Sequence, residues 1–321
     1  MKTFIALAVA GFTAIASPLA QAQAWPSRAI TMVVPQAAGG THDIVGRVVS
    51  AKLAEVLGGP VVVENRVGAG GNVGTAAAAK APKDGYTLLM TISSSQAINP
   101  ALYKDPGFDP VRDFVPLALV GEVPNVLVVN PAFPAKSLEE LIATVKANPG
   151  KYQYASARNG TLNHLLGEML NGMAGLDLQH IPYKGVAPAM TDVISGQVPM
   201  AFASLPSVLG HLKAGRLVAL GVSSPKRSPA LVDVPAIGER VPGYSGTLWI
   251  GLFAPRGIPA DIEAKLKAAM EKVLANPETR ASLVAQGVEL ASATPEQFAA
   301  QLNDDIARWA RIVKASGARI D

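Results

Sequence analysis

Residues 30–34 form an apolar, β-branched run, and from residue 44 onward apolar side chains recur at intervals of three and four. The first pattern is typical of a buried strand and the second of a helix packed against a core. Between them, four of residues 35–40 are alanine or glycine, so few side chains cover the backbone. Thr41 and Asp43 can cap the helix, whose first N–H groups carry the positive end of its dipole. The stretch predicts a strand, a bare loop and a helix, which suits anion binding, although plain tight connections look similar.

Residues 152–164 repeat this pattern: a short strand, small polar residues with Gly160, and a helix opened by Thr161. Two loops of this kind predict a cleft between them. His42 and His164 each lie where one of the helices opens. Helix capping, a solvated histidine and ligand contact all remain open for both side chains.

The rest of the chain alternates apolar runs and helical patterns, which indicates two α/β units. We predict strands at 60–64, 86–91, 117–120, 126–129, 200–203, 217–222 and 248–254, and helices at 75–80, 137–147, 186–195, 207–214, 259–274, 277–286 and 295–316. The chain is expected to cross between domains at 121–125 and 242–246. The domains are then residues 25–123 plus 248–321, and residues 124–247.

Residues 1–24 have the make-up of a secretory signal peptide, with Lys2, an apolar core and small residues at 20–24. That apolar core is too short to span a bilayer, which needs roughly 20 residues. The sequence has no cysteine, which excludes disulfides and a lipid-modified cysteine anchor. We therefore expect an exported, soluble mature chain that is not inserted in the membrane. The net charge of +4 comes from scattered Lys and Arg, which does not indicate nucleic-acid binding.

Motifs for catalysis, metals and cofactors are missing from the sequence. There is no G-x-S-x-G, H-E-x-x-H or P-loop, and the four histidines lack metal-ligand spacing. The glycine-rich stretch 65–74 has Val73 where a dinucleotide fingerprint needs glycine. Ser93, Ser94 and Ser95 follow a predicted strand and could donate to a ligand, with helix capping by Ser95 equally open. We expect no metal and no cofactor.

Several motifs together resemble the substrate-binding proteins of tripartite tricarboxylate transporters, the Bug or TctC-like family. The resemblance extends from Trp25 to the C-terminus and rests on P-x-x-A-G-G-x-x-D-x-x-x-R (35–47), VVVENRVGAGGNVG (61–74), KDGYTLL (83–89), INPALY (98–103), FDPVRDFVPL (108–117), YASARNGTLNH (154–164), IPYKG (181–185), KRSPALVDVPAIGE and TPEQF.

The resemblance implies a two-domain periplasmic binding protein of the Venus-flytrap type, each domain a mostly parallel sheet flanked by helices, with the ligand cleft between the domains. Members hold a carboxylate through backbone amides and bridging waters. The positions carried over from the family are Ala38, Gly39, Gly40, Thr41 and His42 in the first loop, Ser156, Ala157, Arg158, Asn159, Gly160 and Thr161 in the second, and Ala203, Ser204 and Leu205 in a third segment. To these the chain's own pattern adds Ser93.

Two residues depart from the commonest family pattern: His42 replaces a small hydroxyl residue and Arg158 replaces glycine. The guanidinium of an arginine matches a carboxylate. We hypothesise that Arg158, with or without His42, meets a second anionic or polar group of a dicarboxylate or aromatic carboxylate. The alternative is an Arg158 turned to solvent at the rim of the cleft.

The sequence thus predicts a monomeric, non-enzymatic periplasmic protein that binds a small carboxylate by domain closure. It would deliver this ligand to the membrane permease subunits of a tripartite tricarboxylate transporter. A sensor subunit for a signalling receptor is compatible with the same fold. An exported hydrolase using Ser93, Ser94 or Ser95 with a histidine is the alternative from a different class.

Overall fold

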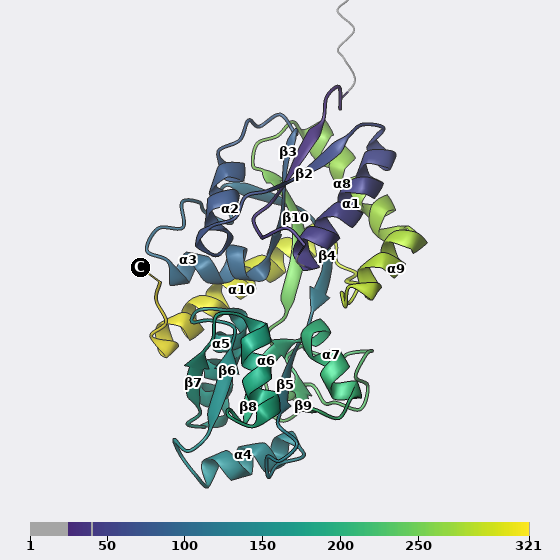
Figure 1. The fold of residues 1–321 in the computed structure, drawn as a ribbon. Coiled ribbons are helices and arrows are strands. Elements are labelled where there is room, and N and C mark those ends of the chain that lie inside the picture. The colour runs from purple at the N-terminus through teal and green to yellow at the C-terminus, as the bar shows by residue number, and fades with distance from the viewer. Residues whose placement is uncertain (1–24, 40, 321) are drawn as a thin grey trace, which may run out of the picture.

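The computed structural model describes residues 25–39 and 41–320, with only the backbone of Thr41. It contains two five-stranded sheets, each with helices packed against it, which form the upper and lower domains of Figure 1. The predicted signal segment, residues 1–24, and the predicted site residue Gly40 lie outside the described residues. Within the described part of the chain, no helix is both long enough and apolar enough to cross a membrane.

The sheet of the first domain has the strand order β2-β1-β3-β10-β4. Its strands are β1 (Ile30–Val34), β2 (Val61–Asn65), β3 (Thr87–Ile92), β4 (Phe114–Val123) and β10 (Leu248–Pro255). The helical segments of this domain are α1 (Thr41–Leu57), η1 (Ala69–Gly71), α2 (Asn72–Ala79), the π-helix η2 (Ser94–Ile98), α3 (Asn99–Leu102), α8 (Ala260–Ala275), α9 (Pro277–Ala285) and α10 (Pro295–Ser316). Apolar residues on α1, α8 and α9 form one core with one face of the sheet.

The sheet of the second domain has the strand order β7-β6-β8-β5-β9. Its strands are β5 (Asn125–Val129), β6 (Gln153–Ser156), β7 (Gln179–Pro182), β8 (Met200–Ser204) and β9 (Val218–Val222). Its helical segments are α4 (Leu138–Lys146), α5 (Leu162–Ala174), α6 (Val186–Ser195), α7 (Leu205–Lys213) and η3 (Ile237–Glu239). Helices α6 and α7 contribute to the core on one face of this sheet.

Both sheets are mixed but mostly parallel, as the sequence predicted, because four of the five strands in each run in the same direction. In the first sheet β10 runs antiparallel to β3 and β4, and in the second β5 runs antiparallel to β8 and β9. The chain enters the second domain through β5 and returns to the first domain through β10. Each of these strands therefore runs away from the domain that the chain has just left. The pairings of β1 with β2 and β3, and of β6 with β7 and β8, are parallel. The carboxyl ends of these parallel strands therefore face the space between the domains.

The two crossings are short and are bonded to each other. Pro124 alone separates β4 from β5, and Thr247 precedes β10. Ser223 bonds both segments: its N–H donates to the Asn125 carbonyl (2.8 Å), its Oγ accepts from the Asn125 N–H (3.0 Å), and that hydroxyl donates to the Gly246 carbonyl (2.6 Å). The crossings therefore form one hydrogen-bonded unit.

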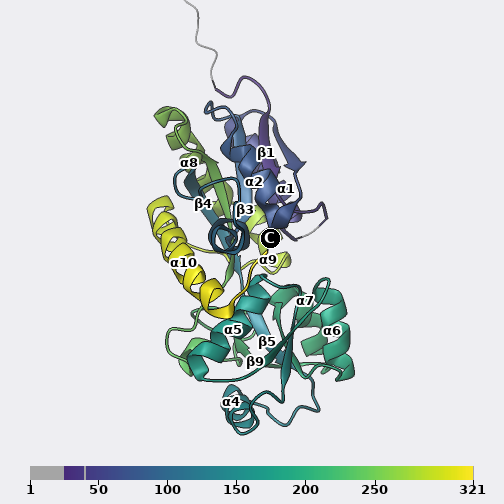
Figure 2. The same cartoon turned by 90° about the vertical axis from the view of Figure 1, so that its left-hand side faces the viewer.

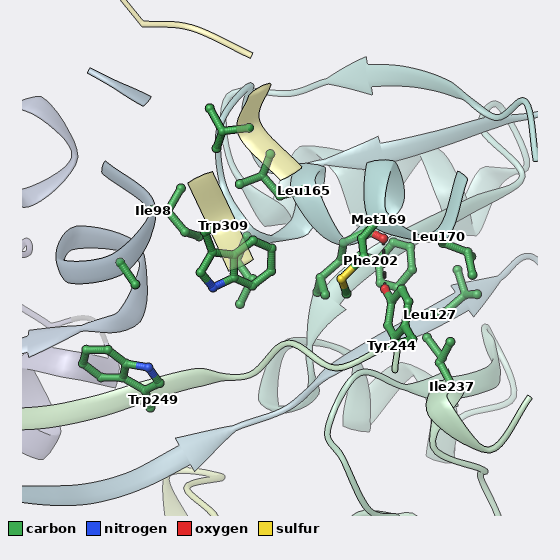
Figure 3. Close-up of a cluster of buried hydrophobic side chains, with 14 of the residues drawn as sticks. Ile98, Leu127, Leu165, Met169, Leu170, Phe202, Ile237, Tyr244, Trp249 and Trp309 are labelled. Atoms are coloured by element: carbon green, nitrogen blue, oxygen red, sulfur yellow. Dashed lines mark hydrogen bonds between the residues drawn. The ribbon is translucent and has the colours of Figure 1, made fainter. Parts of the chain in front are cut away.

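Helix α10 packs on the cores of both domains and lies beside the second crossing, where the Trp249 indole N–H donates to Asp305 of this helix (2.7 Å). It packs against η2, α3 and β4 of the first domain and against α5 of the second, and Figure 2 shows it reaching from one domain to the other. Its buried Trp309 lies between Ile98 of η2 and Leu165 of α5 (Figure 3). The same apolar cluster includes Leu89 in the first sheet and Phe202 in the second. One continuous core thus spans both domains.

Candidate functional site

A cavity of about 500 Å³ lies between the two domains at the carboxyl ends of β1 and β3. The first domain lines it with loop residues Pro35, Gln36 and Ala37, with residues 67–71, and with Ile92, Ser94, Asn99, Leu102 and Tyr103. The second domain lines it with Arg158, Asn159, Gly160 and Thr161, and Ile320 completes the wall. The two loops predicted from the sequence therefore face the same cavity.

The first loop is held by Asp43 in the first turn of α1. This buried carboxylate accepts hydrogen bonds from the Gly39 N–H (2.9 Å), from the Asn65 side chain (2.9 Å) and from Arg47 (3.0 Å). The hydrogen bond from Arg47 is the main reason why the pKa of Asp43 falls to about 2. Ala38 and Gly39 are exposed. Because the Gly39 amide is already bonded, it is not a free donor for a ligand.

The second loop follows β6 and is held by its own side chains. The Thr161 hydroxyl (2.7 Å) and the Ser156 hydroxyl (3.1 Å) both donate to the carbonyl of Arg158. The N–H of Gly185 donates to the carbonyl of Ala157 (2.8 Å), which ties the loop to the start of α6. These bonds fix the backbone on either side of Arg158 while the exposed arginine side chain stays outside the network.

His164 caps the second loop, which was one of the roles the sequence left open. The Gly160 N–H donates to its Nδ1 (3.1 Å), so the neutral ring carries its proton on Nε2. The ring is buried and stacks on His180 with centroids 3.9 Å apart. Burial lowers the pKa of both histidines to about 4, with a contribution from His180 in the case of His164. At neutral pH both rings are uncharged.

His42 and Arg158 differ in what they offer an anion. Burial lowers the pKa of His42 to about 4, so this side chain is neutral at pH 7. Its Nε2 has no hydrogen-bond partner among the described residues. Arg158 offers a guanidinium group, and within the described residues no acidic side chain pairs with it. Of the two departures from the family pattern, Arg158 is the cation that lines the cavity.

The serines after β3 have separate surroundings. Ser93 is fully buried and its hydroxyl donates to the Thr247 carbonyl at the crossing (3.2 Å). Ser94 lines the cavity, while the Ser95 hydroxyl donates to the Gly70 carbonyl (3.1 Å). In the third family segment, the Ser204 hydroxyl lies 3.1 Å from that of Ser207 in the first turn of α7. Ser94 is therefore a better placed ligand donor than Ser93, because the Ser93 hydroxyl is engaged.

The glycine-rich turn at residues 67–71 is a cavity wall that the sequence interpretation missed. Gly71 has φ of +102°, and a Cβ there would lie 2.4 Å from the Ser95 Oγ. Asn99 also donates to the Gly70 carbonyl (3.1 Å). Glycine is needed because the turn packs closely on η2 and α3, and the repeated glycines were the signal that could have indicated such an approach.

One serine lies within hydrogen-bond distance of a histidine in the second domain. The Ser156 Oγ is 2.6 Å from the His180 Nε2, but Ser156 is fully buried. In the described part of the chain, no carboxylate bonds to the His180 ring, so the pair lacks both an accessible nucleophile and an orienting acid. Within the same residues, no group of three or more His, Asp or Glu side chains is arranged to hold a metal ion.

A family model described as the tripartite tricarboxylate transporter family receptor matches residues 45–318. The chain belongs to this family. The family resemblance predicted from the motifs and the two-domain α/β fold are both confirmed.

The match to similar proteins extends over nearly the whole length of this receptor. BugT of Bordetella pertussis is 38% identical over 318 residues, which is 98% of this chain and 96% of that protein. The solved structure of R. palustris Rpa4515 with adipate is 34% identical, covers 92% of this chain and 100% of that chain, and has a TM-score of 0.77. MatC from Rhodopseudomonas palustris with bound malate is 32% identical, covers 90% and 100%, and has a TM-score of 0.74. The two ligand-bound structures thus match about nine-tenths of the receptor.

Proposed function

We propose that this receptor is a periplasmic solute-binding protein that captures a small di- or aromatic carboxylate between its domains and delivers it to the permease of a tripartite tricarboxylate transporter. The observation that supports this most is the cavity between the domains, which is lined by Arg158, an arginine that forms no ion pair with any described residue. Similar proteins hold adipate and malate, which supports a carboxylate ligand. We propose that the ligand-contacting segments are the two loops, with Ser94 in place of Ser93.

The second loop supplies the backbone donors for the first carboxylate. The amides of Arg158 and Asn159 make no hydrogen bond within the described part of the chain, and both residues are exposed to the cavity. The start of α5 adds the positive end of a helix dipole beside them. Closure excludes water, which strengthens these interactions because the effective dielectric constant falls. A ligand that binds the closed form more tightly shifts the population toward it.

Arg158 meets the second anionic group of the ligand. We expect Arg158→Ala to weaken diacid binding at least tenfold, as measured by calorimetry, and to change monoacid binding little. Arg216→Ala removes an exposed arginine of the same domain away from the cavity and is the matched control. Unchanged affinities for both classes would place Arg158 at the rim, and equal losses would place it at the carboxylate that mono- and diacids share; either result removes its role in selectivity.

The ligand class can be found by thermal shift and tryptophan fluorescence with residues 25–321, freed of bound ligand by unfolding and refolding. The panel contains mono-, di- and tricarboxylates, aromatic acids and amino acids. A ligand present at a hundred times its Kd stabilises the folded form by about 2.7 kcal/mol. Buried Trp249 and Trp309 lie in the core that spans both domains and can report closure. If no compound of the panel raises the melting temperature or changes the fluorescence, a carboxylate ligand is rejected.

The alternative roles have separate tests. Loss of uptake of the identified acid in a deletion strain, restored by the intact gene, supports delivery to a permease. Unimpaired uptake combined with a lost transcriptional response would favour the sensor role. Hydrolysis of ester substrates that disappears on Ser94→Ala would favour an enzyme.

A further inference from the structure

The segment that follows α10 turns back to the cavity and is fixed to the first domain. Gly317 has φ of +66°, a left-handed conformation that ends the helix. The Ile320 N–H then donates to the carbonyl of Leu102 (3.1 Å), and Ile320 pairs with Tyr103 in a parallel bridge. Ala318 between them is buried. Ile320 is thus held at one position beside α3.

The Ile320 side chain lies at the cavity where the second loop approaches the first domain. It lines the cavity together with Leu102. A Cβ built on Gly160 would lie 3.3 Å from the Ile320 Cδ1 and 2.5 Å from the Leu102 Cδ2, so the second loop packs directly against both side chains. Neither side chain has a polar atom. This part of the cavity wall is therefore aliphatic and is shared between the domains.

The aliphatic wall lies in the same cavity as the polar groups that suit the ends of an acid. Arg158 supplies a positive charge, and the Ser94 hydroxyl supplies a hydrogen-bond donor. A ligand whose carboxylates use these groups occupies the cavity whose wall includes the Ile320 side chain. A hydroxyl placed against this side chain would lose its hydrogen bonds to water and gain none from the wall, which costs binding free energy.

Building on the proposed function, we propose that Ile320 is a specificity-determining residue of this receptor, which selects acids with a hydrocarbon body over hydroxylated acids of the same length. Rejection of an added hydroxyl by an apolar pocket reaches about a hundredfold at most. We expect the unsubstituted acid of a matched pair to bind about 10- to 100-fold more tightly.

The test uses three pairs that differ only in hydroxyl groups: succinate and malate, adipate and galactarate, and phenylacetate and mandelate. Kd values are measured by calorimetry for the mature chain and for Ile320→Val and Ile320→Thr, which match each other in shape but exchange a methyl for a hydroxyl. Arg319→Ala, an exposed neighbour, is the control for disturbing this segment. Melting temperatures establish that each variant is folded.

We expect Ile320→Val and Arg319→Ala to retain the preference, and Ile320→Thr to reduce the ratio of the two Kd values at least fivefold. Equal affinities within every bound pair, or the same ratio for the Val and Thr variants, would overturn the role of Ile320 and leave carboxylate binding intact. Binding of other carboxylates from the wider panel, but of none of these pairs, would also overturn it. Failure to bind any carboxylate would reject the proposed function itself.

Discussion

The two loops at the cavity share one backbone arrangement, but different side chains stabilise it. In each, the amide of a left-handed glycine donates to a side chain four residues later, from Gly39 to Asp43 and from Gly160 to His164. The acceptor is a charged carboxylate paired with Arg47 in the first loop and a neutral, buried imidazole in the second. We therefore expect the stability of the two loops to differ when a side chain is added, when the acceptor is removed and when the pH changes.

The largest expected difference concerns space around the glycines. An alanine at either position is strained by the positive φ, which costs about 1–2 kcal/mol. At Gly39 no atom of the described residues lies within 4 Å of an added Cβ, whereas at Gly160 the Leu102 side chain is 2.5 Å away. We expect Gly39→Ala to lower the free energy of unfolding by about 1 kcal/mol and Gly160→Ala by about 3 kcal/mol, because overpacking adds to the strain. Urea unfolding measures both, and equal losses would mean that Leu102 moves aside.

The acceptor of the first loop can be removed by Asp43→Ala. The change leaves Gly39 and Asn65 without their partner, and we expect a loss of about 2 kcal/mol in the free energy of unfolding. The exposed Glu55, which pairs with Lys52 on the same helix, is the matched control. Glu55→Ala should change stability little, since exposed ion pairs contribute little. A loss of the same size for both variants would show that Asp43 matters only through surface charge.

The acceptor of the second loop makes stability depend on pH above the range in which Asp43 titrates. The pKa of His164 is about 4 in the folded chain and about 6.5 when unfolded, so the unfolded chain binds more protons between these values. Stability is fully present above pH 6.5 and falls as pH drops toward 4. We expect His164 to account for about 1–2 kcal/mol of the decrease between pH 6.5 and 5.

Urea unfolding at several pH values tests this, with His164→Asn as the comparison. Asparagine keeps an acceptor without a titrating ring, so the slope of stability against pH should become shallower. His180 and His42 also have pKa values of about 4 and leave part of the slope in place. An unchanged slope would mean that His164 is not held neutral by its surroundings.

The smallest expected effect is on the titration of Asp43. Its lowered pKa contributes stability that is present above about pH 4 and is lost as pH falls toward 2. Arg47→Gln removes the main cause of this shift, so the Asp43 pKa should rise toward its ordinary value. NMR of the Asp43 carboxyl carbon measures the change. Arg66→Gln, which breaks the exposed pair with Glu64, should leave that titration where it was.

Local patterns predicted much of the fold but not all of its boundaries. The strand at 30–34 and the helices at 186–195 and 295–316 were predicted with the bounds that the structure has. The strand predicted at 117–120 extends over Phe114–Val123, since pairing with β10 continues beyond the apolar run. The strand β7 was not predicted, because it is only four residues long and partly exposed.

The candidate site was predictable where one local segment forms it. Both loops were found from apolar periodicity, small residues and capping side chains. Leu102 and Ile320 were missed because they are more than 200 positions apart and meet only after folding. The role of His164 could not be chosen from sequence, since capping and ligand contact need the same residue at the same position. The direction of its ring decides between them.

The shared core around Trp309 has a consequence for how the receptor unfolds. If either domain came apart alone, the other would expose the apolar side chains that now surround this tryptophan, including Ile98 or Leu165. Partial unfolding is therefore unfavourable, and heating should produce one calorimetric transition in spite of the two sheets. A fragment containing only residues 124–247 should for the same reason be unable to maintain a native fold. Here the cooperative folding unit is the whole receptor, not the single domain.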